Sequence, residues 1–224
     1  MRASVQTVAV PEPRTSTEGR GDPARATNDD LTAAITAARN GDEAGFVALY
    51  RDLQPRLLRY ATVLVGRDGA EDVTAEAWLH ICRDLPRFSG DIDRFRGWTA
   101  TIVHHRAMDV CRIHARRPTT ALASDDEREE HAGSSDTAAS ALDALSTDLA
   151  LDLIATLPRE QAQAVLLRAV VGLDSRAAAE VLGKRAGAVR VAAHRGLKRL
   201  AQQVRYQPEE GRWTLVRPPT TTQR

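Results

Sequence analysis

Residues 175–205 read SRAAAEVLGKRAGAVRVAAHRGLKRLAQQVR, and three residues in this run predict a helix-turn-helix. Ala179 is small enough for two helices to touch, Gly183 tolerates positive φ in the turn, and Val189 anchors the second helix. This spacing predicts one helix over 175–182 and another over 186–204.

The second of these helices carries an apolar stripe and a basic stripe at helical spacing. The apolar stripe, which we expect to be buried, comprises Val189, Ala193, Leu197, Leu200 and Val204. The basic stripe comprises Arg190, His194, Lys198 and Arg205, joined by Arg195 and Arg199. Seven Lys or Arg and no acidic residue lie between positions 184 and 205, although the whole chain has 31 basic and 30 acidic residues. Together with the turn spacing, this concentration favours DNA binding over a helix that is basic only for solubility.

Outward from this motif, two helical units are predicted. The motif completes a unit over 147–205, whose earlier helices are bounded by Pro158 and Gly172. An earlier unit spans 31–118. From Leu31 the pattern changes, and apolar residues from Phe46 to Leu64 recur at steps of three and four, which predicts one long amphipathic helix ending at Gly66. Its next helix is expected to open with a capping box of Asp68 and Glu71 and to end at Pro86, and a third helix runs over about 95–116.

Three segments lie outside these units. Residues 1–30 are rich in proline and poor in large apolar side chains, so we expect a disordered leader. Residues 119–146 hold seven acidic residues and one arginine, which predicts a flexible acidic linker, and 206–224 read as a flexible tail. The aromatic content of 4% argues against a β-sandwich or barrel. The predicted fold class is all-α, with two small helical domains joined by the linker.

Composition also argues against several classes of site. Cys82 and Cys111 stand 29 residues apart without a CxxC motif, so we expect reduced, buried cysteines and neither a disulfide framework nor a zinc site. His104 and His105 are adjacent, point about 100° apart on a helix and cannot chelate one metal as an i, i+4 pair would. We expect no metal and no cofactor. The chain shows no signal peptide and no apolar run long enough to span a membrane, so we expect a cytoplasmic protein without membrane insertion.

The earlier unit has its own concentration of charge. Six arginines against one aspartate lie between positions 94 and 117, with three histidines interleaved, so a second nucleic-acid surface is expected there. Trp98 at its start either stacks on an exposed base or belongs to the core. Glu71 and Asp72 suit a helix start, where the dipole favours negative charge, but Glu76 does not, which leaves a protein-binding face open.

The order of these parts resembles a known family. The first unit contains GDEAGFVALYRDLQPRLLRYA (41–61), AEDVTAEAWLHICRDLPRF (70–88) and FRGWTATIVHHRAMDVCRIHARRP (95–118). After the linker come IATLPREQAQAVLLRAVVGLDSRAAAEVLG (154–183) and AGAVRVAAHRGLKRL (186–200). The chain is similar to bacterial sigma factors of the extracytoplasmic-function type, group IV of the sigma-70 family, which keep only the second and fourth conserved regions. The resemblance covers about 41–118 and 148–204 and assigns region 2 to 31–118 and region 4 to 147–205.

The resemblance implies a function. The chain would bind the clamp helices and flap of core RNA polymerase, direct it to promoter DNA and help to open the duplex. The nucleotide chemistry would stay with the polymerase, so the chain itself would be no enzyme and have no catalytic residue. An anti-sigma protein is a further partner that the resemblance admits.

The resemblance also assigns roles to residues. Asp72 and Glu76 match positions that contact the polymerase clamp helices. The recognition-helix face for the minus-35 element comprises Arg190, His194, Arg195 and Lys198. The loop 87–93 and the helix after it match the segments that hold the melted minus-10 element, with one base flipped out against the loop. The candidates there are Arg94, Arg96, Trp98, His104, His105, Arg106, Asp109 and Arg112. Val191 and Ala192 depart from the family pattern, which commonly has a small polar residue and an arginine there.

Two rival functions remain. One is a helix-turn-helix regulator that binds DNA alone, with 31–118 as a dimerisation or sensing domain, and tight polymerase-free binding to a palindromic site would favour it. The other is a helical hydrolase or transferase using the region of His104 and His105. This second rival lacks a positioned nucleophile, a glycine-rich phosphate loop and a ligand cluster.

Overall fold

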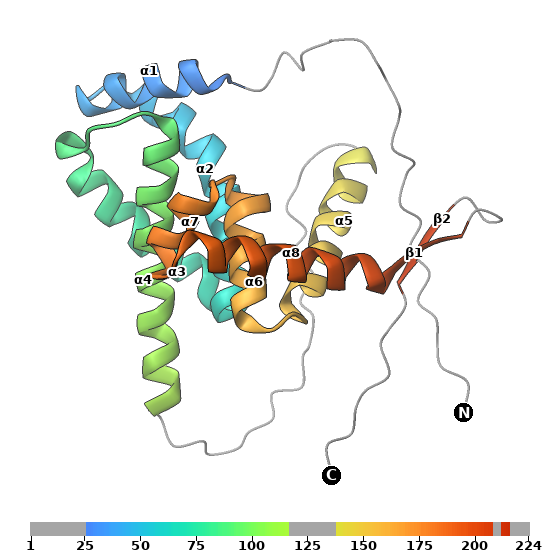
Figure 1. The fold of residues 1–224 in the computed structure, drawn as a ribbon. Helices are drawn as coiled ribbons and strands as arrows, with labels where there is room; N and C mark the ends of the chain where they lie inside the picture. The colour runs from blue at the N-terminus through green and yellow to red at the C-terminus, as the bar shows by residue number, and fades with distance from the viewer. Residues whose placement is uncertain (1–25, 117–137, 208–211, 216–224) are drawn as a thin grey trace.

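The computed structural model describes residues 26–116, 138–207 and 212–215, and nearly all of them are helical. The first group of helices is α1 (Asn28–Arg39), α2 (Glu43–Val65), α3 (Arg67–Asp84) with a short 3-10 turn (Leu85–Arg87), and α4 (Ile92–Arg116). The second group is α5 (Ala138–Ala155), α6 (Arg159–Val165), a π-helical segment (Leu166–Val171), α7 (Ser175–Leu182) and α8 (Ala186–Gln203). Figure 1 shows the two groups. None of the described helices is long and apolar enough to cross a bilayer.

The apolar residues from Phe46 to Leu64 lie on α2, which ends before Gly66 as predicted, and α1 precedes it as a separate helix. The Thr27 side chain and Asp30 form a capping box at the start of α1, and the Asp42 carboxylate accepts from the backbone N–H groups of the first turn of α2. These local caps separate α1 from α2. α1 and α2 pack closely at Gly45, which has no Cβ. A Cβ at this position would lie 2.8 Å from the carbonyl oxygen of Ala34.

The core of the first group lies between α2, α3 and α4. Leu49, Leu53, Leu57 and Tyr60 on α2 are fully buried, as is Phe95 on α4. The expected capping box at the start of α3 is absent: α3 begins at Arg67, its N-cap is Gly66, and no side chain caps it. The helix starts one residue before Asp68, so the Asp68 carboxylate lies inside the first turn. There the helix dipole stabilises its negative charge, but the side chain is not at the N-cap position. The end of α3 before Pro86 agrees with the sequence.

The helix-turn-helix has the predicted geometry. Asp174 caps α7 by accepting from the N–H groups of Arg176 and Ala177. Gly183 adopts φ 61° in the turn, and Val189 on α8 is 1% exposed. A left-handed residue between two short helices favours glycine because a Cβ would be strained there. The three residues that predict the motif therefore occupy the positions expected of them.

The buried face of α8 differs from the prediction at Leu197, and Val204 lies outside this helix, at the start of β1. Leu197 is 51% exposed, and its neighbour Gly196 is buried instead. A Cβ on Gly196 would lie 2.7 Å from Cγ2 of Val165 and 3.3 Å from Cδ1 of Leu157. Since no larger residue fits at this crossing, α8 turns its glycine toward α6, and Leu197 moves to the solvent side.

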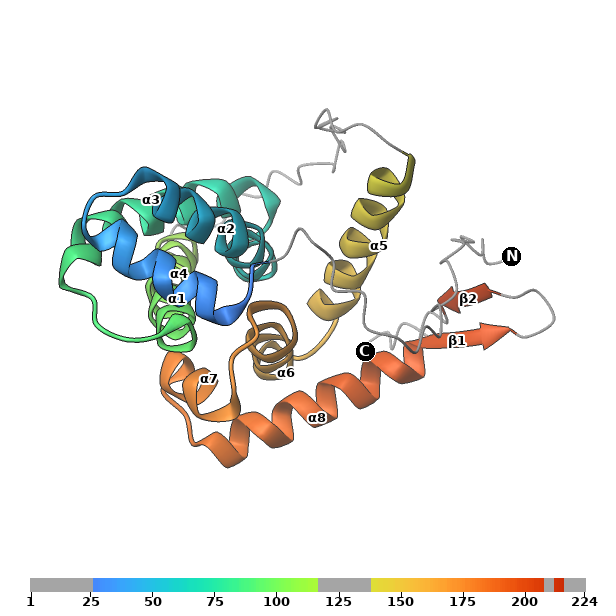
Figure 2. The same cartoon turned by 90° about the horizontal axis from the view of Figure 1, so that it is seen from above.

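The two groups of helices touch, which the linker prediction did not address. α7 packs against α4 (Figure 2), and the π-helical segment packs against α2. The Arg56 guanidinium donates to the carbonyl oxygen of Val170 at 3.4 Å, and Arg67 pairs with Asp148 of α5 at 3.3 Å. These polar contacts join segments more than 80 residues apart in the sequence.

The margins of the predicted segments also shift. α1 begins at Asn28, inside the expected leader, and α5 begins at Ala138, inside the expected linker. Two strands, β1 (Val204–Gln207) and β2 (Arg212–Leu215), pair antiparallel with Val204 opposite Leu215, where the sequence predicted only a tail after the last helix. The rest of the expected leader, linker and tail lies outside the described residues.

Candidate nucleic-acid interface

The solvent face of α8 carries the four minus-35 candidates. Arg190, His194, Arg195 and Lys198 are all exposed, and none of them forms an ion pair within the described residues. α8 itself contains no acidic residue. Basic side chains without ion pairs, on a helix that carries no acidic residue, can contact phosphate oxygens or base edges.

The two positions that depart from the family pattern have different environments. Val191 is 49% exposed and lies among the four minus-35 candidates. Ala192 is half-buried and packs against the core. Only Val191 is therefore available to a ligand on this face.

On α4, four of the minus-10 candidates share one exposed face. Arg94, Trp98, His105 and Arg112 follow one another at steps of four and seven, which places them on one side of a helix. Arg94, His105 and Arg112 are exposed and Trp98 is half-buried. Asp109 lies beside this face and pairs with Arg112 at 3.2 Å, so it reduces the positive charge at that end.

An open hollow lies where this face meets the preceding loop. It is lined by Asp84, Arg87, Phe88, Ser89, Arg94 and Trp98. Trp98 stacks on Phe88 with ring centroids 5.0 Å apart and also packs against Phe95, which is fully buried. Trp98 therefore combines the two alternatives expected for it, a core residue and a surface for base stacking. One part of its ring packs on the core, and another part borders the hollow. A ring held in this way is a rigid surface for stacking.

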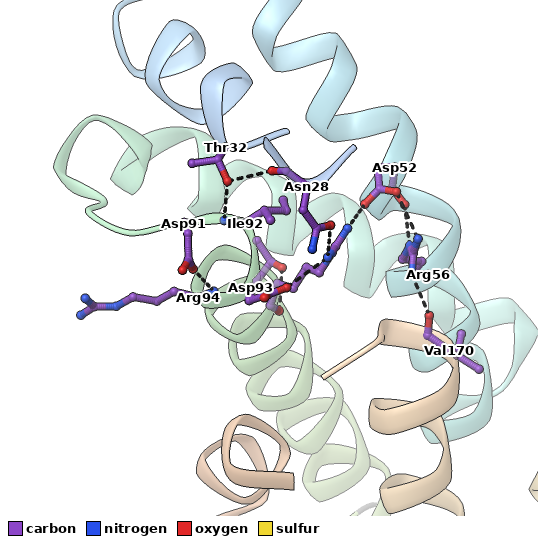
Figure 3. Close-up of polar contacts among 11 residues, drawn as sticks. Asn28, Thr32, Asp52, Arg56, Asp91, Ile92, Asp93, Arg94 and Val170 are labelled. Carbon is purple, nitrogen blue, oxygen red and sulfur yellow. Dashed lines mark hydrogen bonds and ion pairs between the residues drawn. The ribbon is translucent and has the colours of Figure 1, made fainter. Parts of the chain in front are cut away.

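Arg96 is not on this face, which corrects the sequence prediction. Its side chain is 10% exposed and pairs with Asp52 at 3.3 Å and Asp93 at 3.2 Å, while Nη1 donates to Oδ1 of Asn28 at 3.0 Å. Asp52 also pairs with Arg56 at 3.1 Å. Figure 3 shows this network between α1, α2 and α4, with Arg94 extending away from it. Arg96 joins helices of the core, because its position on α4 faces α2 and not solvent.

His104 is also turned away from the exposed face. Its Nδ1 is hydrogen-bonded to the Tyr60 hydroxyl at 2.8 Å. Burial, with smaller contributions from His105 and Arg159, lowers the pKa of His104 to about 4, so the ring is neutral near pH 7. A neutral, half-buried imidazole is a weak candidate for phosphate contact. Arg106 is half-buried as well.

The acidic candidates on α3 are accessible. Asp72 and Glu76 are exposed, and they lie four residues apart on one face. Leu79, three residues beyond Glu76, is 72% exposed and extends this face with an apolar side chain, which the sequence analysis did not single out. The signal for it was present, since the buried positions Val73 and Ile81 place Leu79 on the opposite side of the helix.

Cys82 is exposed on α3, which corrects the expectation of a buried thiol. Cys111 is half-buried and donates to the carbonyl oxygen of Leu64 at 3.5 Å. Within the described residues no group of three or more His, Cys, Asp or Glu side chains is placed to hold a metal ion.

Comparison with known proteins follows the same division of the chain. The family model for Sigma-70 region 2 matches residues 49–117, and the model for Sigma-70, region 4 matches residues 147–200. ECF RNA polymerase sigma factor ShbA of Streptomyces griseus is 32% identical over 183 residues, covering 77% of this chain and 96% of the relative. ECF RNA polymerase sigma factor SigD of Mycobacterium tuberculosis is 30% identical over 179 residues, covering 78% and 84%. The solved structure of CnrH in complex with the cytosolic domain of CnrY shares the fold, with a TM-score of 0.52 at 20% identity over 77% of this chain and 96% of that one.

Proposed function

The chain belongs to the extracytoplasmic-function sigma factors of the sigma-70 family, and from that premise we propose which of its surfaces carries each step of transcription initiation. As an alternative sigma factor it directs RNA polymerase to promoters. The match of residues 49–117 to region 2 is contrary to a stand-alone regulator in which 31–118 is a dimerisation or sensing domain. Sigma factors are transcription initiation factors. This one, we propose, contributes no catalytic residue and acts in the cytoplasm, where core polymerase and the chromosome are.

The observation that carries the proposal is the solvent face of α8. Arg190, His194, Arg195 and Lys198 are exposed and free of ion pairs within the described residues, on a helix without acids. α8 is the second helix of a helix-turn-helix, the element that enters the major groove in such motifs. It binds the minus-35 element with these four side chains on phosphates and guanine edges.

The test replaces two of these basic residues and compares the effect on promoter binding with the effect on affinity for core polymerase. In the double variant Arg190→Ala/Lys198→Ala, polymerase-dependent run-off transcription should fall at least about tenfold, and the salt dependence of promoter binding should become shallower by about one per lost phosphate contact. Affinity for core polymerase should stay unchanged. Arg39→Ala, which removes an exposed arginine at the end of α1, is the control and should change neither. Equal loss of polymerase affinity in the double variant would contradict this role of α8.

The exposed face of α4 and the hollow beside it bind the melted minus-10 element in our proposal. Arg94 and Trp98 line the hollow, and His105 and Arg112 continue the same face. A flipped base needs a pocket and a stacking surface to offset the unstacking that opens the duplex. Arg96 and His104 take no part in this contact, since core partners hold both side chains.

Strand binding separates this role from that of α8. Arg94→Ala and His105→Ala should weaken binding of the holoenzyme to a single-stranded oligonucleotide that carries the non-template minus-10 strand of a mapped promoter. His114→Ala is the matched control, because His114 is also exposed but lies about 180° around α4 from His105. If His114→Ala weakened binding as much as His105→Ala, the assigned face would be wrong.

Asp72 and Glu76 bind the polymerase clamp helices in our proposal, and Leu79 extends this contact. Two carboxylates beside an exposed leucine form a compact patch that suits a basic and apolar partner surface. The double variant Asp72→Asn/Glu76→Gln should lose core polymerase affinity, measured by fluorescence anisotropy of labelled chain. Glu43→Gln on α2, an exposed carboxylate elsewhere, should not. Unchanged polymerase affinity in the double variant would refute the assignment.

An anti-sigma protein is the last partner we propose, and its support is family membership alone. Affinity capture of the tagged chain from its own cells should recover core polymerase subunits. A second, stoichiometric protein that is displaced when core polymerase is added would identify an anti-sigma partner. Recovery of polymerase alone under inducing and non-inducing conditions would remove this partner from the proposal.

A further inference from the structure

One apolar side chain, that of Val191, lies on the solvent face of α8 opposite the buried side, among basic residues. Val189, Ala193 and Gly196 mark the buried side of the helix. At about 100° per residue, Val191 lies roughly 200° around the axis from Val189, directly opposite the buried side. Lys198, two turns later, points the same way. A side chain in this direction goes deepest into whatever α8 docks against.

Val191 has no packing role that explains it. It is 49% exposed, and large apolar side chains with at least 40% exposure are few in the described residues: Tyr50, Leu79, Ile113, Val191 and Leu197. A β-branched residue also has lower helix propensity than the alanines and arginines around it. Exposed apolar surface that contributes nothing to the folded core gains from contact with a partner.

The surroundings of Val191 suit a DNA duplex as that partner. Seven Lys or Arg and no acidic residue lie between positions 184 and 205, which matches a polyanion. Arg190 and Arg195 flank Val191 on the two sides of the face, where they can reach phosphates or guanine edges. Valine has no donor or acceptor. The one apolar group that a base pair presents in the major groove is the C5-methyl group of thymine.

We propose that Val191 is a specificity-determining residue that packs on the 5-methyl group of one thymine in the minus-35 element. The inference rests on the proposed docking of α8 in the major groove. It adds selection of a thymine, which the arginines and the lysine do not provide, because these side chains read guanine or phosphate. The valine methyl groups replace water over the thymine methyl, and cytosine at that position leaves them without an apolar partner.

The experiment changes one methyl group on each side of the contact. Run-off transcription with core polymerase and the wild-type chain first maps the start sites and the minus-35 element. Each thymine of that element is then replaced in turn by deoxyuridine, which removes the 5-methyl group and keeps the pairing edge. Holoenzyme binding to each duplex is measured for wild type, Val191→Ala and Leu197→Ala. Leu197 is the matched control, because it is equally exposed on α8 but lies roughly 120° away from Val191.

We expect one thymine at which deoxyuridine lowers wild-type affinity about three- to fivefold, the effect of one buried methyl group. Val191→Ala should weaken binding to the thymine duplex and should no longer distinguish it from the deoxyuridine duplex. Leu197→Ala should keep the full distinction. Because Val191 is exposed, its replacement should leave the melting temperature within about 2 °C of wild type.

The failures of the two proposals are distinguishable. If the wild-type chain produces no polymerase-dependent start sites, the promoter function itself fails. If start sites are mapped but their minus-35 element contains no thymine, or no thymine responds to loss of its methyl group, only the role of Val191 is overturned. The same holds if Val191→Ala discriminates between thymine and deoxyuridine as well as wild type does.

Discussion

Replacement of Arg96 by alanine should destabilise the chain, although the sequence pattern places this residue on a DNA-binding surface. Removal of one partner from a buried ion pair costs about 3–5 kcal/mol, because the other charge is left buried without compensation. Here Asp52 keeps Arg56 at 3.1 Å, and Nε of Arg96 has no hydrogen-bond partner among the described residues. Both features reduce the loss, so we expect a decrease of about 2–3 kcal/mol in the free energy of unfolding.

Urea unfolding followed by circular dichroism measures this directly. Arg96→Ala should shift the transition midpoint to lower urea with little change in slope. Arg94→Ala, two residues earlier and exposed, should stay within about 0.5 kcal/mol of wild type. At a temperature where both variants are folded, Arg94→Ala should lose minus-10 strand binding and Arg96→Ala should keep it. Wild-type stability with lost strand binding in Arg96→Ala would refute the assignment of this residue to the core.

Two further predictions concern packing and pH. Gly196→Ala should lower the melting temperature, because the new Cβ would lie 2.7 Å from Cγ2 of Val165, whereas Gly187→Ala on the same helix has nothing within 4 Å and should gain up to about 1 kcal/mol of helix propensity. Equal effects of the two alanines would show that the crossing of α6 and α8 tolerates a methyl group. Burial holds the pKa of His104 at about 4 in the folded chain, below the value near 6.5 of an unfolded chain, so stability should be constant above about pH 6.5 and fall as pH drops toward 4. The loss is at most about 2 kcal/mol, because this ring is partly exposed to solvent. In His104→Gln the urea midpoint should change less between pH 7 and pH 4 than it does in the wild type. In His105→Gln the midpoint should depend on pH as it does in the wild type.

The helix-turn-helix could be predicted because its determinants are local. A glycine with positive φ at position 183 and an apolar anchor six residues later act within one turn and its neighbouring helices. The start of α1 at Asn28 depends on a capping box of Thr27 and Asp30, which is equally local. The sequence analysis did not predict this capping box, because it lies at the end of a proline-rich segment that is polar throughout. At Asp68 the same kind of pattern misled, since α3 had already begun at Arg67.

The amino-acid pattern thus determined the class of the fold, the order of its two helical units and the helix that carries the basic face, because periodicity, turn glycines and charge runs act over a few residues. Only tertiary packing decided which residues of a helix remain available to a ligand. Arg94 and Arg96 are two residues apart on α4, yet one extends into solvent and the other is held by Asp52 from α2. On α8, Gly196 faces the core and Leu197 faces solvent, because Val165 leaves no room for a larger side chain at position 196. Helical periodicity predicts which side chains share one face of a helix. Neighbouring helices that are distant in the sequence determine which of these faces is buried.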